Sequence, residues 1–300
     1  VIPVRCGHIN LSDILQNLPA ARGSFPMKYL GLPLSVWRLR KVDFQFLEDK
    51  AAAKLVPWDG QNITSMGRTA LVKSVLPSQA IYFITTLVVP TSTLKNLNKL
   101  ERAFLWEGTD KTTGAKCKVN WDTVCRPIAN GGLGVLNTEK FARALRIRWI
   151  WFEWKEPTKM WVGMGNPCDN ADYNFFYASS TIIVGNGARI PFWDSPWVHN
   201  RKPMDLAPLI YAASTSKNWK VREALKDGAW VKKIKMTSDF SIEHFRQFLE
   251  LWATIRDFHL QEDIDDDIVW KHSTSGLYTV ESAYKAQFLG LIRSPLEHAV

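Results

Sequence analysis

The chain has 300 residues, of which 46% are hydrophobic and 22% charged, and its formal net charge is +9. This composition is typical of a folded protein with a sizeable core and excludes a disordered chain. No apolar run reaches the roughly 20 residues of a membrane-spanning helix, so we expect a soluble protein with no membrane partner. Its four cysteines show neither CxxC nor paired His spacing, and no secretory signal is present. These features exclude a structural zinc site and predict an intracellular protein with free thiols, in either the nucleus or the cytoplasm.

The positive charge is concentrated in the first half of the chain. Residues 1–160 contain 23 Lys and Arg against 12 Asp and Glu, net +11, whereas residues 161–300 contain 15 against 17, net −2. Because Lys and Arg neutralise phosphates regardless of base sequence, the basic half is where a nucleic acid would bind. A solvated basic surface without any ligand explains the charge equally well.

The chain begins without Met and with an apolar run that predicts a strand over residues 1–6. We therefore interpret it as a fragment of a longer protein. Residues 29–34 are bounded by Pro26 and Pro33, which favours a short edge strand or an extended segment.

Helical periodicity follows over residues 43–55, 65–82 and 94–108. In the second of these segments Ser65 is the expected N-cap, and Pro77 is expected to kink or split the helix. Arg68 and Lys73 lie off its apolar stripe. We expect these segments to form a helical bundle with one basic helix face.

The glycine-rich segment 129–134 has two interpretations. A glycine-rich loop before a helix can bind phosphate through backbone N–H groups, but no Gly-Lys-Ser/Thr follows it, so we favour a structural turn. The next helix, residues 138–154, carries a basic row formed by Lys140, Arg143 and Arg146, with Arg148 close by. Such a row is either a phosphate-tracking surface or a solvated face.

Strand signals appear further along the chain. Asn186-Gly187 between two apolar runs predicts a hairpin that pairs residues 182–184 with residues 188–193. A short strand is expected at residues 277–280, followed by a helix that ends by Gly290. The acidic run 262–267 has no EF-hand spacing and is interpreted as an exposed linker.

Seven segments of the chain, in this order, resemble the region that follows the polymerase core in reverse transcriptases of LINE-type (non-LTR) retrotransposons, particularly those of plants. They are FPMKYLGLPLS (25–35), WDGQNITSMGRTALVKSVLPSQAIY (58–82), LERAFLWEG (100–108), VNWDTVCRPIANGGLGVLN (119–137), ALRIRWIWFEW (144–154), VGNGARIPFWDSPWV (184–198) and DIVWKHSTSGLYTVESAY (267–284).

The resemblance implies a mainly α fold with a few short β-hairpins, in which a thumb-like helical bundle precedes an irregular helical connection region. The expected segments are the end of the polymerase palm (1–35), the thumb-like bundle (36–110), a basic Trp-rich helical region (111–165), a hairpin-containing connection (166–260) and the start of the region before a zinc-binding module (261–300), the module itself being absent.

Polymerases of this family hold two metal ions with paired aspartates in an aromatic-x-Asp-Asp motif, and this sequence contains no such motif. We therefore expect a non-catalytic fragment without metal or cofactor that helps to bind an RNA/DNA template–primer duplex. Its other expected partners are the palm and zinc-binding parts of the parent polyprotein. The alternative is a degenerate transposon relic whose helices only pack. The candidate nucleic-acid-binding residues are Arg68, Lys73, Lys140, Arg143, Arg146 and Arg148.

Overall fold

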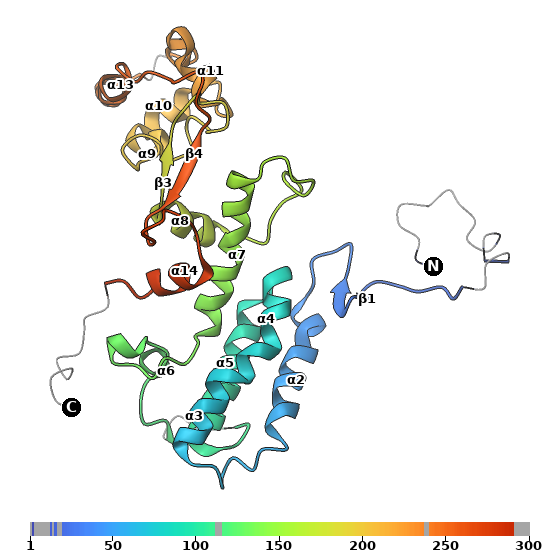
Figure 1. Cartoon of the computed structure of the whole chain (residues 1–300). Helices are drawn as coiled ribbons and strands as arrows, with labels where there is room; N and C mark the ends of the chain where they lie inside the picture. Colours follow the sequence, from blue (N-terminus) through green and yellow to red (C-terminus); the bar gives the residue numbers. More distant parts are fainter. Residues whose placement is uncertain are drawn as a thin grey trace. The chain divides into compact units, whose positions relative to one another are not determined.

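A computed structural model describes residues 2, 13, 15, 16, 20–111, 116–236 and 240–290 (Figure 1). These residues are mainly α-helical with two small antiparallel sheets, which confirms the predicted fold class at that level. Apart from Ile2, the strand expected at residues 1–6 lies outside the described residues. The chain divides into two compact units, and the boundary follows Ala142. We call the described residues up to Ala142 unit 1 and those from Arg143 onward unit 2.

Unit 1 begins with a hairpin and continues as a helical bundle. In the hairpin, Met27 lies opposite Leu34 and Tyr29 opposite Leu32. The single strand or extended segment expected over residues 29–34 is therefore wrong, because the chain turns at Leu30 and Gly31 and forms two strands. The elements of unit 1 are β1 (Met27–Tyr29), β2 (Leu32–Leu34), η1 (Lys41–Phe44), α2 (Gln45–Leu55), α3 (Ser65–Ser74), α4 (Leu76–Thr86), α5 (Thr91–Glu107), α6 (Trp121–Val124) and η3 (Ile128–Asn130).

Helices α3 and α4 begin where the local chemistry dictates. Thr64, not Ser65 as predicted, is the N-cap of α3, since its hydroxyl accepts a hydrogen bond from the Gly67 N–H at 3.2 Å. Pro77 lies in the first turn of α4. Backbone N–H groups in the first turn make no hydrogen bond within the helix, so the lack of an N–H in proline costs nothing there. The predicted split of the helix at this proline is therefore confirmed.

Helix α5 packs against α2 and α3 (Figure 1). Phe104 is fully buried and its ring lies 5.5 Å from that of Trp58, centroid to centroid. The turn after α2 meets the end of α5 at two glycines, because a Cβ on Gly60 would lie 2.3 Å from the carbonyl oxygen of Gly108. The core around this contact consists of Leu55, Val72, Leu76, Phe104, Leu105, Val124, Cys125 and Val135.

The glycine-rich segment 129–134 is a structural turn, as favoured from the sequence. Gly131 has a φ of 75°, in the left-handed region that favours glycine. A Cβ on Gly132 would lie 2.2 Å from the carbonyl oxygen of Arg126. The backbone of the segment hydrogen-bonds to the residues just before it, from Gly134 N–H to Arg126 O at 2.9 Å.

Unit 2 is built from many short helices and one small sheet. Helix α7 begins in unit 1 and continues into unit 2. The elements are α7 (Thr138–Lys155), α8 (Asn170–Ala178), β3 (Ser180–Ile183), α9 (Pro203–Leu206), α10 (Pro208–Ala213), α11 (Val221–Leu225), η4 (Lys226–Gly228), α12 (Ala229–Lys232), α13 (Ile242–Ile255), β4 (Asp267–Trp270) and α14 (Val280–Ala286).

The hairpin predicted around Asn186-Gly187 is wrong. Strand β3 pairs antiparallel with β4, more than 80 positions along the chain, with Ser180 opposite Trp270. The segment after the turn bonds elsewhere, from Phe192 N–H to Trp219 O at 2.8 Å. The strand expected at residues 277–280 is also absent from the structure, because β4 lies further upstream and Thr279 caps α14.

Tryptophans anchor the core of unit 2. Trp193 and Trp270 are fully buried, and Trp197 and Trp230 nearly so. The Phe192 ring lies 4.9 Å from that of Trp193. Each buried indole N–H needs an acceptor, and that of Trp270 donates to the Ser282 hydroxyl at 2.9 Å.

Within the described residues, the helices are all too short or too polar to cross a lipid bilayer.

Candidate nucleic-acid interface

Arg143 and Arg146, two of the predicted phosphate contacts, are engaged with a buried carboxylate. Asp172 is fully buried, and it accepts hydrogen bonds from Arg143 Nε at 3.2 Å and from Arg146 Nε and Nη2 at 2.6 and 3.0 Å. Burial disfavours the charged form of Arg146, but its hydrogen bonds to Asp172 and the charge of Asp172 outweigh this and raise the pKa of Arg146. The same carboxylate accepts the backbone N–H of Asp169 at the start of α8. These arginines therefore have a structural role in unit 2.

The predicted basic row crosses the boundary between the units. Lys140 belongs to unit 1, whereas Arg143, Arg146 and Arg148 belong to unit 2. Arg148 lies over the rings of Trp149 and Phe152, at 5.7 and 5.9 Å from their centroids. The structure thus brings Arg143 and Arg146 together at Asp172. Arg148 instead makes cation–π contacts with the two aromatic rings.

Arg68 and Lys73 differ in exposure although both lie on α3. Arg68 is half-buried, and its Nε is shielded from solvent without a hydrogen-bond partner in the described part of the chain. Lys73 is exposed, with its ammonium next to Gly134 of the glycine-rich turn. Lys73 is therefore the more accessible of the two candidates.

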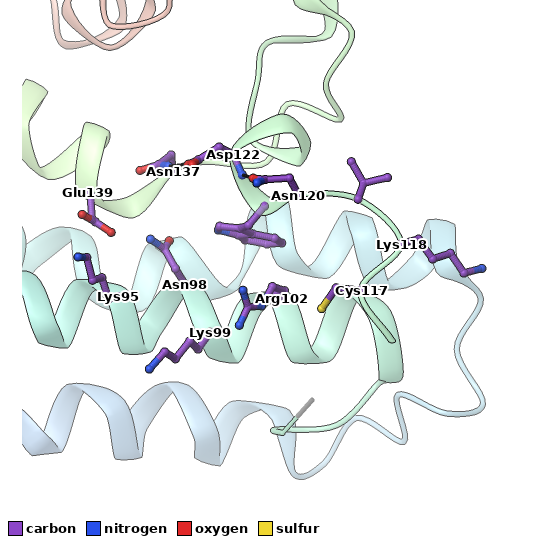
Figure 2. Close-up of a pocket in the computed structure, with 12 residues that line it drawn as sticks. Lys95, Asn98, Lys99, Arg102, Cys117, Lys118, Asn120, Asp122, Asn137 and Glu139 are labelled. Carbon is purple, nitrogen blue, oxygen red and sulfur yellow. Dashed lines mark hydrogen bonds between the residues drawn. The ribbon is translucent and has the colours of Figure 1, made fainter. Parts of the chain in front are cut away.

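A pocket of about 570 Å³ lies in unit 1, between one face of α5 and the segment that leads into α6 (Figure 2). Figure 2 shows side chains projecting from α5 towards Asn120 and Asp122 on that segment. Asn120 caps α6 by accepting the Asp122 N–H at 2.8 Å. The lining residues are Lys95, Asn98, Lys99, Arg102, Cys117, Lys118, Val119, Asn120, Trp121, Asp122, Asn137 and Glu139.

Two asparagines that line the pocket, Asn98 and Asn137, accept hydrogen bonds from the start of α7. Asn137 Oδ1 accepts the Lys140 N–H at 3.0 Å, and Asn98 Oδ1 accepts the Thr138 N–H at 3.3 Å. The first-turn N–H groups of α7 therefore have side-chain acceptors from two elements. These bonds hold α5 and the start of α7 together at the pocket.

The pocket is basic. It is lined by four cationic side chains, Lys95, Lys99, Arg102 and Lys118, against two carboxylates. Within the described ranges none of these four cations forms an ion pair. Both lysines of α5 are exposed and Arg102 is half-buried. The positive charges of the pocket are therefore not paired with carboxylates of the described residues, and they can attract an anion.

These cations are not among the site residues predicted from the sequence. Lys95, Lys99 and Arg102 recur at i, i+4 and i+7, the spacing that places residues on one helix face. The helical periodicity over residues 94–108 therefore contains the signal for this basic face.

The acidic run 262–267 is not simply an exposed linker. Asp266 is buried, and its carboxylate accepts the backbone N–H groups of Gly185, Gly187 and Arg189, each at 2.9 Å. The expectation is wrong for this residue, because three converging N–H donors satisfy a buried carboxylate. Among the described residues, no group of three or more His, Cys, Asp or Glu side chains could share a metal ion.

A protein of Arabidopsis thaliana named "Putative ribonuclease H protein" is 25% identical to the chain over 283 residues. The match covers 85% of the chain and 44% of the relative, so the chain spans less than half the length of that protein. No family model matches the chain, and no solved structure matches it significantly.

Proposed function

We propose that the chain is the thumb and post-thumb part of a transposon-derived, LINE-like reverse transcriptase, and that it binds template–primer duplex without copying it. The ordered motifs support the family, and the relative's name, which denotes action on RNA, supports a link to nucleic acid. We assign the described residues a binding role and no catalytic one. In the parent protein they would act beside a palm and a zinc-binding module.

The proposal rests mainly on where the excess of positively charged side chains lies in the chain. Residues 1–142 contain 18 Lys and Arg against 10 Asp and Glu, net +8, whereas residues 143–291 contain 19 against 18, net +1. Four of the cations of unit 1 line one pocket without ion-pair partners in the described structure. A polyanion gains most from cations that the protein itself does not neutralise.

We therefore assign the phosphate contacts to unit 1, principally to Lys95 and Lys99, with Lys73 on α3 as a further candidate. Arg143 and Arg146 contribute indirectly, by holding α8 against α7. Binding through lysine–phosphate contacts is weak, sensitive to salt and indifferent to base sequence.

The test is the salt dependence of duplex binding. Each phosphate contact adds about 0.9 to the slope of log affinity against log salt. We expect the double variant Lys95→Gln/Lys99→Gln to lower this slope by about 1 to 2 for an RNA/DNA hybrid. The matched control is Lys232→Gln/Lys235→Gln, which removes the same charge from two exposed lysines of unit 2.

An equal loss in both double variants would show a general charge effect and contradict the assignment to the pocket. Absence of duplex retention at low salt would favour the alternative, a transposon relic that packs but does not bind. Product formation in a primer-extension assay with Mg²⁺ would contradict the non-catalytic role.

A further inference from the structure

We propose that a pocket of unit 2, formed by α7, α8 and the segment after β3, binds an unpaired nucleobase that carries an amino group. The base would stack on an aromatic wall, and its amino group would donate to Glu153. The inference rests on the proposed function in one respect, because the base would belong to the nucleic acid that the chain binds. Three observations carry it: an accessible aromatic wall, a carboxylate with an unused oxygen, and balanced charge.

The aromatic wall consists of Trp154 on α7 and of Tyr173 and Tyr177 on α8, which line a pocket of about 240 Å³. All three side chains are half-buried, so a ligand can reach them, unlike the fully buried tryptophans of the core. The volume lies just below the range of sites for drug-sized molecules, roughly 300 to 1,000 Å³. The pocket therefore suits a single planar ring system.

Hydrogen bonds hold the walls of the pocket in place. Arg189 Nη2 donates to the backbone carbonyl oxygens of Glu153 and Trp154, at 3.2 and 2.7 Å, and its guanidinium carbon lies 5.2 Å from the centroid of the Trp154 ring. Asn166 Nδ2 donates to the Tyr173 hydroxyl at 2.7 Å. Side chains that are already fixed lose little conformational freedom when a ligand binds.

Glu153 offers an acceptor that the protein leaves unused. One oxygen of its carboxylate accepts a hydrogen bond from Asn166 Nδ2 at 3.2 Å, whereas the other accepts none from the residues that the structure describes. Glu153 also forms no ion pair within these residues. Because a carboxylate only accepts, the ligand must present a donor. Cytosine, adenine and guanine each present an amino group, and a Glu carboxylate accepts well from that of cytosine.

The charge of the pocket favours a neutral ligand. Its charged lining residues are Glu153 and Arg189, which have opposite signs. Glu153 would repel a phosphate group. Aromatic rings attract an organic cation, but the guanidinium of Arg189 already lies over the Trp154 ring and would repel one. A neutral base avoids both penalties and stacks on aromatic side chains.

The experiment measures the affinity of the full chain for cytidine and uridine by ligand-observed NMR titration at constant ionic strength. Neither nucleoside has a phosphate, and cytidine has an amino group where uridine has a carbonyl oxygen. We expect cytidine to bind about tenfold more tightly, because the uridine oxygen would face the carboxylate. A third probe, N-acetyltyrosinamide, presents the aromatic ring of a protein side chain, and we expect it to bind more weakly than cytidine.

Glu153→Gln keeps the shape of the side chain and makes it a neutral amide, so we expect the preference for cytidine over uridine to be lost. The matched control is Glu156→Gln, which should keep the preference. Glu156 lies just after α7, pairs with Lys159 and does not line the pocket.

Trp154→Leu removes part of the stacking surface, so we expect it to weaken the binding of both nucleosides about tenfold. Trp252→Leu is the control and should leave both affinities unchanged. Arg256 lies 5.1 Å from the Trp252 ring, much as Arg189 lies over Trp154, but Trp252 is 40% exposed on α13 and does not line the pocket. The Glu153 variant keeps the test decisive if Trp154→Leu lowers the unfolding temperature.

Oligonucleotides identify the source of the base. Glu153→Gln should weaken the binding of single-stranded oligodeoxycytidylate and leave the binding of its duplex unchanged, because a paired base is enclosed in the helix. A loss for cytidine without a loss for the single strand would identify a free nucleoside as the ligand.

Equal affinities of the wild type for cytidine and uridine, tighter binding of N-acetyltyrosinamide than of cytidine, or a preference that survives Glu153→Gln would overturn the proposal. Failure of the proposed function has a different signature, namely duplex binding that does not depend on Lys95 and Lys99. Since the nucleosides carry no phosphate, the two results are distinguishable.

Discussion

Arg146 donates two hydrogen bonds, at 2.6 and 3.0 Å, to the fully buried carboxylate of Asp172. This bidentate pair joins α7 to the first turn of α8, where Asp172 also completes the capping box with Asp169. Arg146, which the sequence suggests as a phosphate contact, therefore binds a carboxylate of the protein itself.

Replacing Arg146 by Met should destabilise unit 2 by about 3 kcal/mol. The loss arises because Asp172 would stay buried with only Arg143 as a cationic partner. Urea unfolding followed by tryptophan fluorescence measures it. Arg246→Met is the control, since Arg246 pairs with Glu243 and Glu250 on the exposed face of α13, and little change is expected. A similar small effect at Arg146 would contradict the structural role.

Asp266→Asn should destabilise unit 2 by about 2 kcal/mol or more. The carboxylate accepts three backbone N–H groups, and an amide would replace one acceptor oxygen by an NH₂ donor facing those donors. The measurement is the thermal unfolding temperature with the corresponding unfolding enthalpy.

The control for Asp266 is Asp263→Asn, an exposed position of the same acidic run, which should change stability by less than about 0.5 kcal/mol. Equal effects at the two positions would mean that the three hydrogen bonds contribute no more than surface charge does.

Local signals predicted the helices of unit 1 well. Proline at position 77 and the apolar periodicity around it fix where α3 ends and α4 begins, because both act within one or two helical turns. The N-cap was misplaced by one residue, since Thr64 and Ser65 are both good caps and only the backbone geometry chooses between them.

Long-range pairing could not be predicted. The chain does bend at Asn186, but Asp266 binds the backbone of this segment and β3 pairs with β4, both from a distant part of the chain. Short-range turn signals contain no information about such partners. The same limit applies to the site, because helical spacing reveals one face of α5 but not the segment opposite it.

Gly60→Ala should destabilise unit 1 strongly, by about 2 kcal/mol or more, as for other overpacked sites. The added Cβ would lie 2.3 Å from the carbonyl oxygen of Gly108 and 2.6 Å from the Phe104 ring. Backbone in that position cannot move away without separating the end of α5 from the turn after α2. Thermal unfolding of the variant measures the cost.

The control for Gly60 is Gly228→Ala, where φ is 62° and no atom lies within 4 Å of the added Cβ. We expect Gly228→Ala to lower stability by only about 1 kcal/mol, the cost of holding a residue with a Cβ in the left-handed backbone region. A Gly60 variant no less stable than the Gly228 variant would show that the two glycine backbones need not be in contact.

Glu101 should make the stability of unit 1 depend on pH. It is almost fully buried on α5, its Oε2 has no hydrogen-bond partner in the described residues, and burial raises its pKa from 4.5 to about 8. The folded protein therefore holds a proton that the unfolded chain releases. As pH rises from about 4.5 to about 8, the unfolding free energy should fall, by at most about 1.4 kcal/mol per pH unit, and then level off.

The Glu101→Gln variant isolates this effect because its side chain is neutral at every pH. The wild type should lose stability relative to the variant between pH 5 and pH 8, measured by urea unfolding across that range. Other titrating groups contribute equally to both proteins and cancel in the difference. A difference that stays constant with pH would mean that Glu101 is ionised in the folded state, and this buried position of α5 would then need a cationic partner.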